Sequence, residues 1–582
     1  MICIIFYLPL YFEFMKWITL LLLFVLPLLL NAQEEVYFNA RIFTADRDHP
    51  FAEAIAIKGK WIVAVGNYDD VKGSVSKNAK QIDLGGSFLM PGFVDSHNHA
   101  IGGGADLLKP NTGDKMISVE ELLSYAKKEL HAKEKMTGDI LVIYGLNIST
   151  WSAVDSLTGV FNANEFATQP LVLRGSDGHT AWCNKAMMER AGLNLNFIIN
   201  SLKPEEKVFY GMSDNKPNGF VSESGYRKIS AVIHSDIDYH EASEKAMEYN
   251  NSYGITAWLD PTAGNTEKKT QEYLEAYTWL IDSGKLTAHI AATIVADADN
   301  DPGTQIAFVK KLQQKYDRDD LSIIGFKIFA DGVIEHPTHT AALSLPYTET
   351  HSKGVLMFDP KKFASFVTAA DKQHLLVHVH AIGDKAVTET LNGFETARRA
   401  NGNSGLPHTI THLQIVQPSD FARFKKLNVL ASYQLLWAFG DVTTIDIVKP
   451  CIDPSLYKWQ YPARSMLQAG ATICGASDWP VSSANPLEAI YCAETRKGPM
   501  GVLDSTQCMP RMEMMYAYTI EAAKALMLEK KIGSLQAGKY ADMIVLDRDV
   551  LSVPAEEMQA ALVQWTMFEG KIVYDGATQK SF

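Results

Sequence analysis

The sequence has 582 residues, of which 47% are hydrophobic and 21% are charged, and its formal net charge is −13. A chain of this length and composition can bury a large core, which excludes global disorder. The negative charge and the lack of a long basic run disfavour nucleic acid as a partner, because phosphate binding needs clustered lysine and arginine.

The N-terminus has the pattern of a targeting segment. One lysine, Lys16, precedes an apolar run over 17–30, and "NAQ" follows it. This pattern predicts a secretory signal peptide over 1–32 with cleavage near Ala32, and a periplasmic or secreted mature protein. The alternative is an uncleaved membrane anchor, because the apolar run and the residues before it approach spanning length. We expect contact with a membrane only through this segment.

Both ends of the mature chain carry alternating apolar residues that predict short strands. The stretches "KGKWIVAVG" and "FEGKIVYDG" each place a Gly-Lys turn before such an alternation. Half-buried strands need partners to be stable. We therefore expect one small β-sandwich domain formed from residues 33–91 and 526–582.

The middle of the chain alternates strand-like apolar runs with helical stretches. The eight runs cover 92–99, 254–260, 288–297, 321–332, 375–384, 408–416, 428–436 and 471–479. Eight β-α units predict an α/β fold, a (β/α)8 TIM-like barrel over 92–525. Residues of about 103–250 exceed an ordinary loop, and we interpret them as a large insertion after the first strand.

Ionisable residues recur at the ends of these runs. His97 and His99 are two residues apart and so point the same way from the first strand. One such pair is weak evidence, but other strand ends repeat the pattern with Lys327, His380 (or His378, two residues before it), His412 and Asp478. Such groups are costly in a barrel core unless a cation compensates them, and imidazole and carboxylate are preferred ligands. The set exceeds what one tetrahedral zinc needs and predicts a two-metal site.

The motifs that carry these residues occur in a characteristic order. They are "PGFVDSHNH", "SDGHTAWCNKAM", "KIFADGVIEHPTHTAAL", "HVHAIGDKAV", "ITHLQIVQPSD" and "GASDWPV". In this order they resemble the metal-dependent amidohydrolase superfamily, and in particular its YtcJ-like branch, which includes N-substituted formamide deformylases. The resemblance covers roughly residues 35–582.

The resemblance implies a site with two divalent metal ions, for which the ligand types favour Zn²⁺. The implied ligands are His97, His99 and Asp478 for one ion, His380 and His412 for the other, and Lys327 between them. Lys327 would bridge the ions after carboxylation by carbon dioxide, since an ammonium group cannot ligate a metal. The alternatives are an ion pair between Lys327 and Asp331, and a site with one metal.

The implied activity is hydrolysis of an amide-type C–N bond in an N-acyl or N-formyl small molecule by a metal-activated hydroxide. Asp478 is the expected catalytic proton carrier, and His179 is the expected catalytic donor to the carbonyl or oxyanion. The substrate-side candidates, each of which also has a structural interpretation, are Trp182, Glu223, Glu335, His336 and His339. The alternatives are ester or carbamate hydrolysis, isomerisation, or metal binding without catalysis. The sequence is also compatible with a homo-oligomer.

The six cysteines are scattered along the chain, and Cys3 would leave with the signal peptide. The remaining five are too few for a disulfide scaffold. One or two disulfides among Cys451, Cys492 and Cys508 are compatible with an oxidising compartment.

Overall fold

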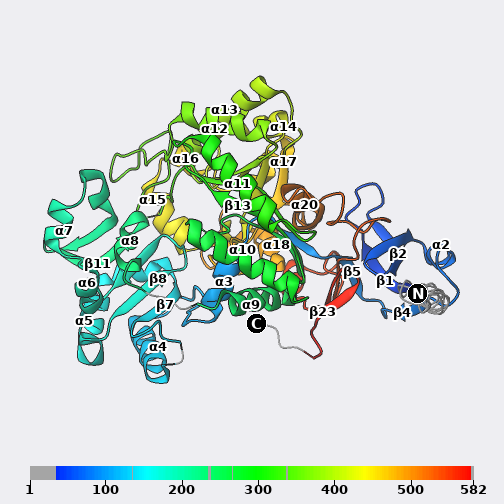
Figure 1. Cartoon of the computed structure of the whole chain (residues 1–582), viewed down its shortest axis with the longest axis horizontal. Coiled ribbons are helices and arrows are strands. Elements are labelled where there is room, and N and C mark those ends of the chain that lie inside the picture. Colours follow the sequence, from blue (N-terminus) through cyan, green and yellow to red (C-terminus); the bar gives the residue numbers. More distant parts are fainter. Residues whose placement is uncertain (1–33, 134, 234–236, 265, 336–337, 579–582) are drawn as a thin grey trace, which may run out of the picture.

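The computed structural model describes residues 34–133, 135–233, 237–264, 266–335 and 338–578. A central barrel separates the small β domain, coloured mainly blue and red, from the insertion, coloured cyan (Figure 1). The predicted signal peptide over 1–32 lies outside these residues. Within the described ranges, no helix is both long and apolar enough to cross a bilayer.

The barrel is one parallel sheet whose strand order follows the chain. Its strands are β6 (Phe93–Asp95), β12 (Ile255–Asp260), β13 (His289–Val295), β14 (Leu321–Phe329), β15 (Leu376–Ala381), β16 (Thr409–His412), β17 (Leu430–Tyr433) and β18 (Thr472–Gly475). The first and last strands meet where the backbone N–H of Ser96 donates to the Gly475 carbonyl at 3.0 Å. All eight predicted strands are present, so the expected TIM-like barrel is confirmed.

Helices cover the outside of the barrel. They are α9 (Tyr239–Ser252), α10 (Glu267–Asp282), α11 (Pro302–Tyr316), α12 (Pro360–Lys372), α13 (Asp384–Asn401), α14 (Pro418–Leu427), α17 (Ala463–Gln468), α18 (Pro486–Thr495), α19 (Arg511–Tyr516) and α20 (Ala522–Ala525). Helix α12 illustrates why they form. Its N-cap Asp359 accepts backbone N–H groups of the first turn, and Phe363, Phe366, Val367 and Ala370 recur at helical spacing and are buried.

The small β domain joins the two ends of the mature chain. Its strands are β1 (Glu34–Phe43), β2 (Phe51–Lys58), β3 (Trp61–Gly66), β4 (Lys80–Asp83), β5 (Phe88–Pro91), β21 (Met543–Leu546), β22 (Val563–Phe568) and β23 (Lys571–Asp575). The N- and C-terminal parts meet where β5 pairs antiparallel with β21. All eight strands belong to one hydrogen-bonded sheet, rather than to the two facing sheets of the expected β-sandwich.

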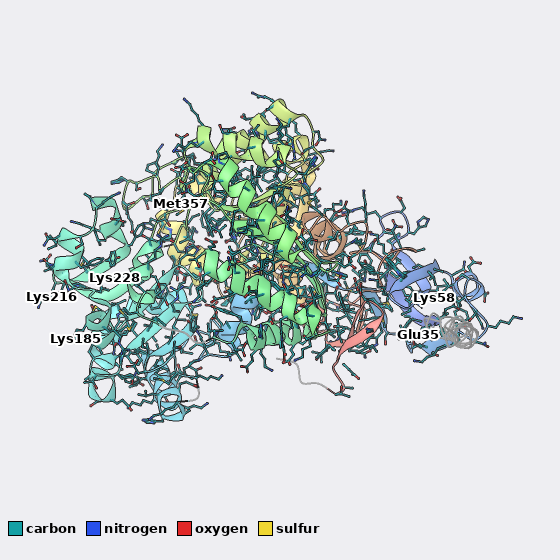
Figure 2. The ribbon with its side chains drawn as sticks, in the orientation of Figure 1. Glu35, Lys58, Lys185, Lys216, Lys228 and Met357 are labelled. Carbon is teal, nitrogen blue, oxygen red and sulfur yellow. The ribbon has the colours of Figure 1, made fainter. Side chains whose placement is uncertain are left out.

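The insertion has its own sheet and core. Strands β7 (Leu141–Leu146), β8 (Leu171–Gly175), β9 (Thr180–Cys183), β10 (Tyr210–Ser213) and β11 (Lys216–Ser222) form a five-stranded sheet in the order β10-β11-β9-β8-β7. Around it lie α4 (Val119–Ala132), α5 (Val154–Phe161), α6 (Lys185–Ala191), α7 (Leu195–Asn200) and α8 (Tyr226–Ser230). Figure 2 shows Lys185 and Lys216 on the insertion, far from Lys58 on the small β domain. Helix α3 (Ala100–Leu107) packs on α9, so the inserted part follows α3.

The five cysteines of the described chain are all free. Four of them, Cys183, Cys451, Cys474 and Cys492, are buried. The disulfides considered for Cys451, Cys492 and Cys508 are therefore not formed in this structure.

Candidate metal centre

The candidate ligands lie at the carboxyl ends of the barrel strands, where barrel active sites collect. His97 and His99 follow β6, His380 lies near the end of β15, His412 ends β16, and Asp478 follows β18. His412 and Asp478 have φ angles of 76° and 57°, a left-handed conformation that is uncommon for residues with a Cβ. Strained backbone of this kind clusters at functional sites.

Asp478 is the centre of the cluster. Its Oδ1 lies 3.2 Å from His97 Nε2 and 3.1 Å from His99 Nε2. Its Oδ2 lies 4.0 Å from His412 Nδ1. The His412 ring centre is 5.1 Å from that of His97 and 4.5 Å from that of His380. Five of the six predicted ligands thus meet at one end of the barrel.

Two buried polar atoms of this cluster have no hydrogen-bond partner in the described chain. They are His97 Nε2 and Asp478 Oδ1, and their approach lacks hydrogen-bond geometry. Unpaired buried polar atoms are costly and rare. One ligand atom each from His97, His412 and Asp478 lies within 4.8 Å of the others. These atoms therefore fit a divalent cation, which would satisfy them all.

Burial keeps the imidazoles neutral, as metal ligation requires. Removal from water is the main reason that the pKa values of His97 and His412 are held well below the usual range. The same cause, with the nearby charge of Lys327, lowers the pKa of His380 to about 3. Neutral rings offer a nitrogen lone pair to a cation.

Hydrogen bonds distinguish the two histidines of β15. The Nε2 of His378 lies 2.7 Å from His97 Nδ1, so His378 supports a ligand from behind. The Nε2–H of His380 donates to the Gly332 carbonyl at 3.1 Å, which leaves Nδ1 with the free lone pair. This arrangement favours His380 over His378 as the ligand from this strand.

Two neutral side chains that the sequence analysis missed also orient the ligands. His99 Nδ1 is hydrogen-bonded to Thr262 Oγ1 at 2.8 Å, and His412 Nδ1–H donates to Gln434 Oε1 at 3.0 Å. Such partners fix the ring orientation and the tautomer of metal-binding histidines. Both residues lie just beyond strand ends, but no charge marks them in the sequence.

Lys327 is buried in β14, with 1% of its surface exposed. Burial lowers the pKa of its ammonium to about 7, against the opposing effect of the Asp478 charge. With a pKa near 7, a substantial share of the amine is neutral at pH 7, and the neutral amine is a competent nucleophile toward carbon dioxide. The alternative ion pair with Asp331 is not formed, because the Asp331 carboxylate accepts backbone N–H groups of Ala342, Ile382 and Gly383.

The insertion brings His179 to the metal centre. The His179 ring centre lies 6.1 Å from that of His380, and its Nδ1 lies 3.0 Å from Glu223 Oε2. Glu335 follows β14 and is half-buried. Burial raises the pKa of its carboxyl, the charge of Asp177 adds to this rise, and the charge of His179 opposes it. His179, Glu223 and Glu335 therefore lie near the centre, whereas His336 is outside the described residues.

Two expected substrate contacts are corrected by the structure. Trp182 is fully buried in the core of the insertion, where its Nε1–H donates to the Asn218 carbonyl at 2.9 Å. His339 is buried in the loop after β14, stacked on Tyr347, with its Nε2 3.3 Å from Cys451 Sγ. Both side chains pack within the protein instead of facing a substrate.

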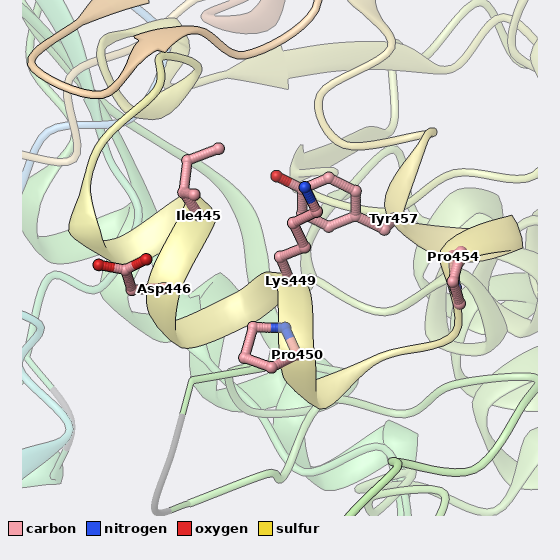
Figure 3. A pocket seen from close by; sticks show the side chains of 6 residues that line it. All are labelled: Ile445, Asp446, Lys449, Pro450, Pro454 and Tyr457. Carbon is pink, nitrogen blue, oxygen red and sulfur yellow. The ribbon is translucent and has the colours of Figure 1, made fainter.

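A surface hollow of about 500 Å³ lies on the loop that follows β17 (Figure 3). It is lined by Ile445, Asp446, Lys449, Pro450, Pro454 and Tyr457. The lining includes none of the predicted metal ligands, and we do not assign it to the reaction.

A comparison with protein families identifies the chain. The sequence model described as the amidohydrolase family matches residues 80–574, which is most of the chain. The chain belongs to the amidohydrolase family. Its similarity to the YtcJ protein and to an N-substituted formamide deformylase places this amidohydrolase in the YtcJ-like branch of the superfamily.

Three relatives match nearly the whole chain. "Protein LONG AFTER FAR-RED 3" of Arabidopsis thaliana is 27% identical and covers 92% of this chain and 91% of its own. "Putative amidohydrolase YtcJ" of Bacillus subtilis is 24% identical, with 93% of this chain and 99% of its own covered. "N-substituted formamide deformylase" of Arthrobacter pascens is 23% identical, with 92% and 97% covered.

Solved structures share the fold. An uncharacterized metal-dependent hydrolase from Pyrococcus horikoshii superposes with a TM-score of 0.68 at 23% identity, covering 90% of this chain and 99% of its own. The corresponding protein from Pyrococcus furiosus has a TM-score of 0.66 at 25% identity, covering 89% and 100%. These likenesses support the barrel architecture of this amidohydrolase.

Proposed function

We propose that this amidohydrolase cleaves the amide-type C–N bond of an N-acyl or N-formyl small molecule. The observation that carries the proposal is the pair of buried, unpaired atoms His97 Nε2 and Asp478 Oδ1 beside His412. Family membership supports metal-dependent hydrolysis. A relative named for formamide deformylation and shorter matches named as 5-methylthioadenosine/S-adenosylhomocysteine deaminases support C–N bonds as the target.

We propose that the donor set holds two divalent cations. His97, His99 and Asp478 would hold one, His380 and His412 the other, and a carboxylated Lys327 would contact both. Nitrogen and carboxylate ligands suit Zn²⁺. When bound, such cations polarise a carbonyl group and lower the pKa of water toward neutrality.

The side chains of this protein would then move and stabilise charge. Asp478 would take a proton from the attacking water and pass it to the leaving nitrogen. His179 Nε2–H would donate to the carbonyl oxygen as negative charge develops there. Glu335, half-buried near His179, would contact the rest of the substrate.

The proposal is tested with purified residues 33–582. We would measure bound metals and hydrolysis of a panel of N-formyl and N-acyl amines, with esters and carbamates alongside. Hydrolysis of amides that a chelator abolishes and Zn²⁺ restores supports the proposal. If the protein turns over only esters or carbamates, or catalyses an isomerisation, the site carries out another reaction. Tight metal binding with no turnover would indicate a catalytically silent protein.

We further propose that residues 1–32 direct export to the periplasm or the exterior and are then removed. The support is the sequence pattern alone. N-terminal sequencing of the protein recovered from cell fractions tests this. A start near residue 33 in a soluble exported fraction supports cleavage, whereas an intact N-terminus in the membrane fraction supports an anchor.

A further inference from the structure

His179 and Glu223 are held side by side by the sheet of the insertion. Strand β11 pairs antiparallel with β9 so that Ser222 lies opposite Thr180. One residue further, the backbone N–H of Glu223 donates to the His179 carbonyl at 2.8 Å. The two side chains also meet, because His179 Nδ1–H donates to Glu223 Oε2 at 3.0 Å. One backbone hydrogen bond and one side-chain hydrogen bond thus both hold His179 and Glu223 together.

The backbone of Glu223 is strained. Its φ angle is 45°, in the left-handed region that residues with a Cβ rarely adopt. Such conformations cost free energy and persist where the surroundings over-determine them, often at functional sites. Here the strained residue directly follows β11 and places its carboxylate against His179.

The other carboxylate oxygen of Glu223 contacts the barrel. Thr340 Oγ1 donates to Glu223 Oε1 at 3.3 Å, and Thr340 Oγ1 in turn accepts the backbone N–H of Val333 at 3.1 Å. Gly332 lies beside this contact, where a Cβ would be 2.1 Å from Thr340 Oγ1 and 3.1 Å from Glu223 Oε1. The Gly332 carbonyl is the acceptor for His380. Glu223 therefore links the insertion to the loop that supports a metal ligand.

This arrangement leaves one ring nitrogen of His179 without a partner in the described part of the chain. Nδ1–H is taken by Glu223, so Nε2 is the ring atom that remains available to a substrate. Nε2 has no hydrogen-bond partner among the described residues, and 24% of the side chain is exposed.

We infer that Glu223 is a positioning residue that holds His179, carried by the insertion, so that its Nε2 is available to a substrate at the metal centre. This inference rests on the proposed hydrolase function. It assigns the insertion a part in the reaction, because the site lacks its oxyanion donor unless the insertion is docked on the loop at Thr340.

The kinetic test compares His179→Ala, Glu223→Ala and the double variant on the best amide substrate. Removal of an oxyanion donor lowers kcat by about 10²–10³-fold, and we expect Glu223→Ala to lower kcat by about 10–10²-fold with little change in KM. If Glu223 acts through His179, the double variant is no slower than His179→Ala. Multiplied losses in the double variant would overturn the inference.

A matched control and a conservative variant separate positioning from folding. Glu165 in the insertion also pairs with a histidine, His131, at 2.9 Å but in an exposed position. Glu165→Ala is expected to keep full kcat. Glu223→Gln retains an acceptor for Nδ1–H and is expected to keep more activity than Glu223→Ala. If Glu223→Ala does not fold, Glu223→Gln takes its place in the kinetic comparison.

A second readout does not require activity. Crystal structures of the metal-free variants should show the His179 ring in its wild-type orientation in Glu165→Ala and displaced or without a single orientation in Glu223→Ala. An unchanged ring in Glu223→Ala would overturn the inference. If the wild-type protein hydrolyses no compound of the panel, the proposed function fails, while the ring orientation still decides the positioning role.

Discussion

His97 and Asp478, which follow the first and the last strands of the barrel, share a backbone hydrogen bond and also bring their side chains together. The backbone N–H of Asp478 donates to the His97 carbonyl at 2.8 Å, and the side-chain atoms Nε2 and Oδ1 lie 3.2 Å apart. The backbone contact closes the barrel at the point where the two side chains face a common ligand. The contact that closes the barrel therefore also brings two candidate metal ligands together.

Asp478→Asn tests this centre most directly. The amide keeps the side-chain size but removes the negative charge that a cation and a proton both need, so we expect a loss of kcat of at least about 100-fold and lower bound metal. Metal analysis measures the bound metal, and steady-state kinetics measure kcat. Asp301→Asn is the control, because Asp301 caps α11 on the surface and Asn is an equally good cap. Retained metal and activity in Asp478→Asn would contradict the assignment.

Thr262→Val tests the support of His99. Val has nearly the shape of Thr but cannot hydrogen-bond to His99 Nδ1, so we expect about 10–100-fold weaker metal binding with little change in stability. Competition with a chelator measures the affinity. Thr396→Val, which removes a hydroxyl that bonds a helix carbonyl in α13, should leave metal affinity unchanged. Equal affinity in the two variants would exclude a role for Thr262.

Carboxylation of Lys327 is predicted from its burial. Because the pKa of Lys327 is lowered to about 7, its amine can attack carbon dioxide at neutral pH. We expect the protein incubated with ¹³C-labelled bicarbonate and Zn²⁺ to show a carbamate signal in its ¹³C NMR spectrum. Lys327→Met should lack the signal and lose activity. A spectrum identical in both proteins would leave Lys327 as an uncarboxylated amine and favour a one-metal site.

His289 predicts how the junction between the barrel and the small β domain responds to pH. Its Nδ1 lies 2.8 Å from Asp320 and its Nε2 lies 2.9 Å from Asp542. Burial alone would lower the pKa of His289, but the charge of Asp542 and the hydrogen bonds to both carboxylates raise it to about 9. Because this folded-state pKa exceeds the unfolded value of about 6.5, the stabilisation is fully present below about pH 6.5 and is lost as the pH rises through about 9.

The corresponding experiment compares urea unfolding of the wild-type protein and His289→Gln. The difference in the free energy of unfolding should be larger near pH 6 than near pH 9.5. Asp542→Asn removes the negative charge beside His289. Its loss of stability relative to the wild-type protein should show the same pH dependence. A difference that stays constant with pH would mean that His289 is neutral in the folded protein.

A side chain at Gly104 in α3 is predicted to lower the stability of the protein. A Cβ at this position would lie 1.9 Å from the carbonyl oxygen of Ala242 in α9, so Gly104→Ala would push the two helices apart. We expect a destabilisation of about 1–3 kcal/mol and weaker metal binding, since His99 immediately precedes α3. Gly159→Ala, in a helix of the insertion with no atom within 4 Å of the new Cβ, should be neutral or stabilising by up to about 1 kcal/mol. Thermal unfolding compares the two variants, and equal stability would contradict the prediction.

The barrel was predictable because its signals are local and repeated. Each strand is a short apolar run, and the strand ends carry ionisable residues that an apolar core would otherwise not tolerate. His97, His380, His412 and Asp478 therefore stand out one by one, and parallel strands bring their carboxyl ends together. Thr262 and Gln434 do not stand out, because a neutral side chain after a strand is ordinary.

The missed features depend on contacts between distant segments. Strand β9 is buried on both faces, so its sequence does not reveal that Trp182 points into the core of the insertion. His339 is fixed by Tyr347 and by Cys451 from the loop after β17, which no local pattern encodes. Alternating residues likewise predicted the strands of the small β domain but not that they join in one sheet.

The pairing of β5 with β21 has a consequence for the order in which the protein can be made. During synthesis the first strands leave the ribosome with an open edge, and the strand that covers it emerges only after the whole barrel. The edge of β5 therefore stays unpaired until translation is almost finished. A product truncated before β21 would keep this unpaired strand edge, which can pair with another chain and lead to self-association.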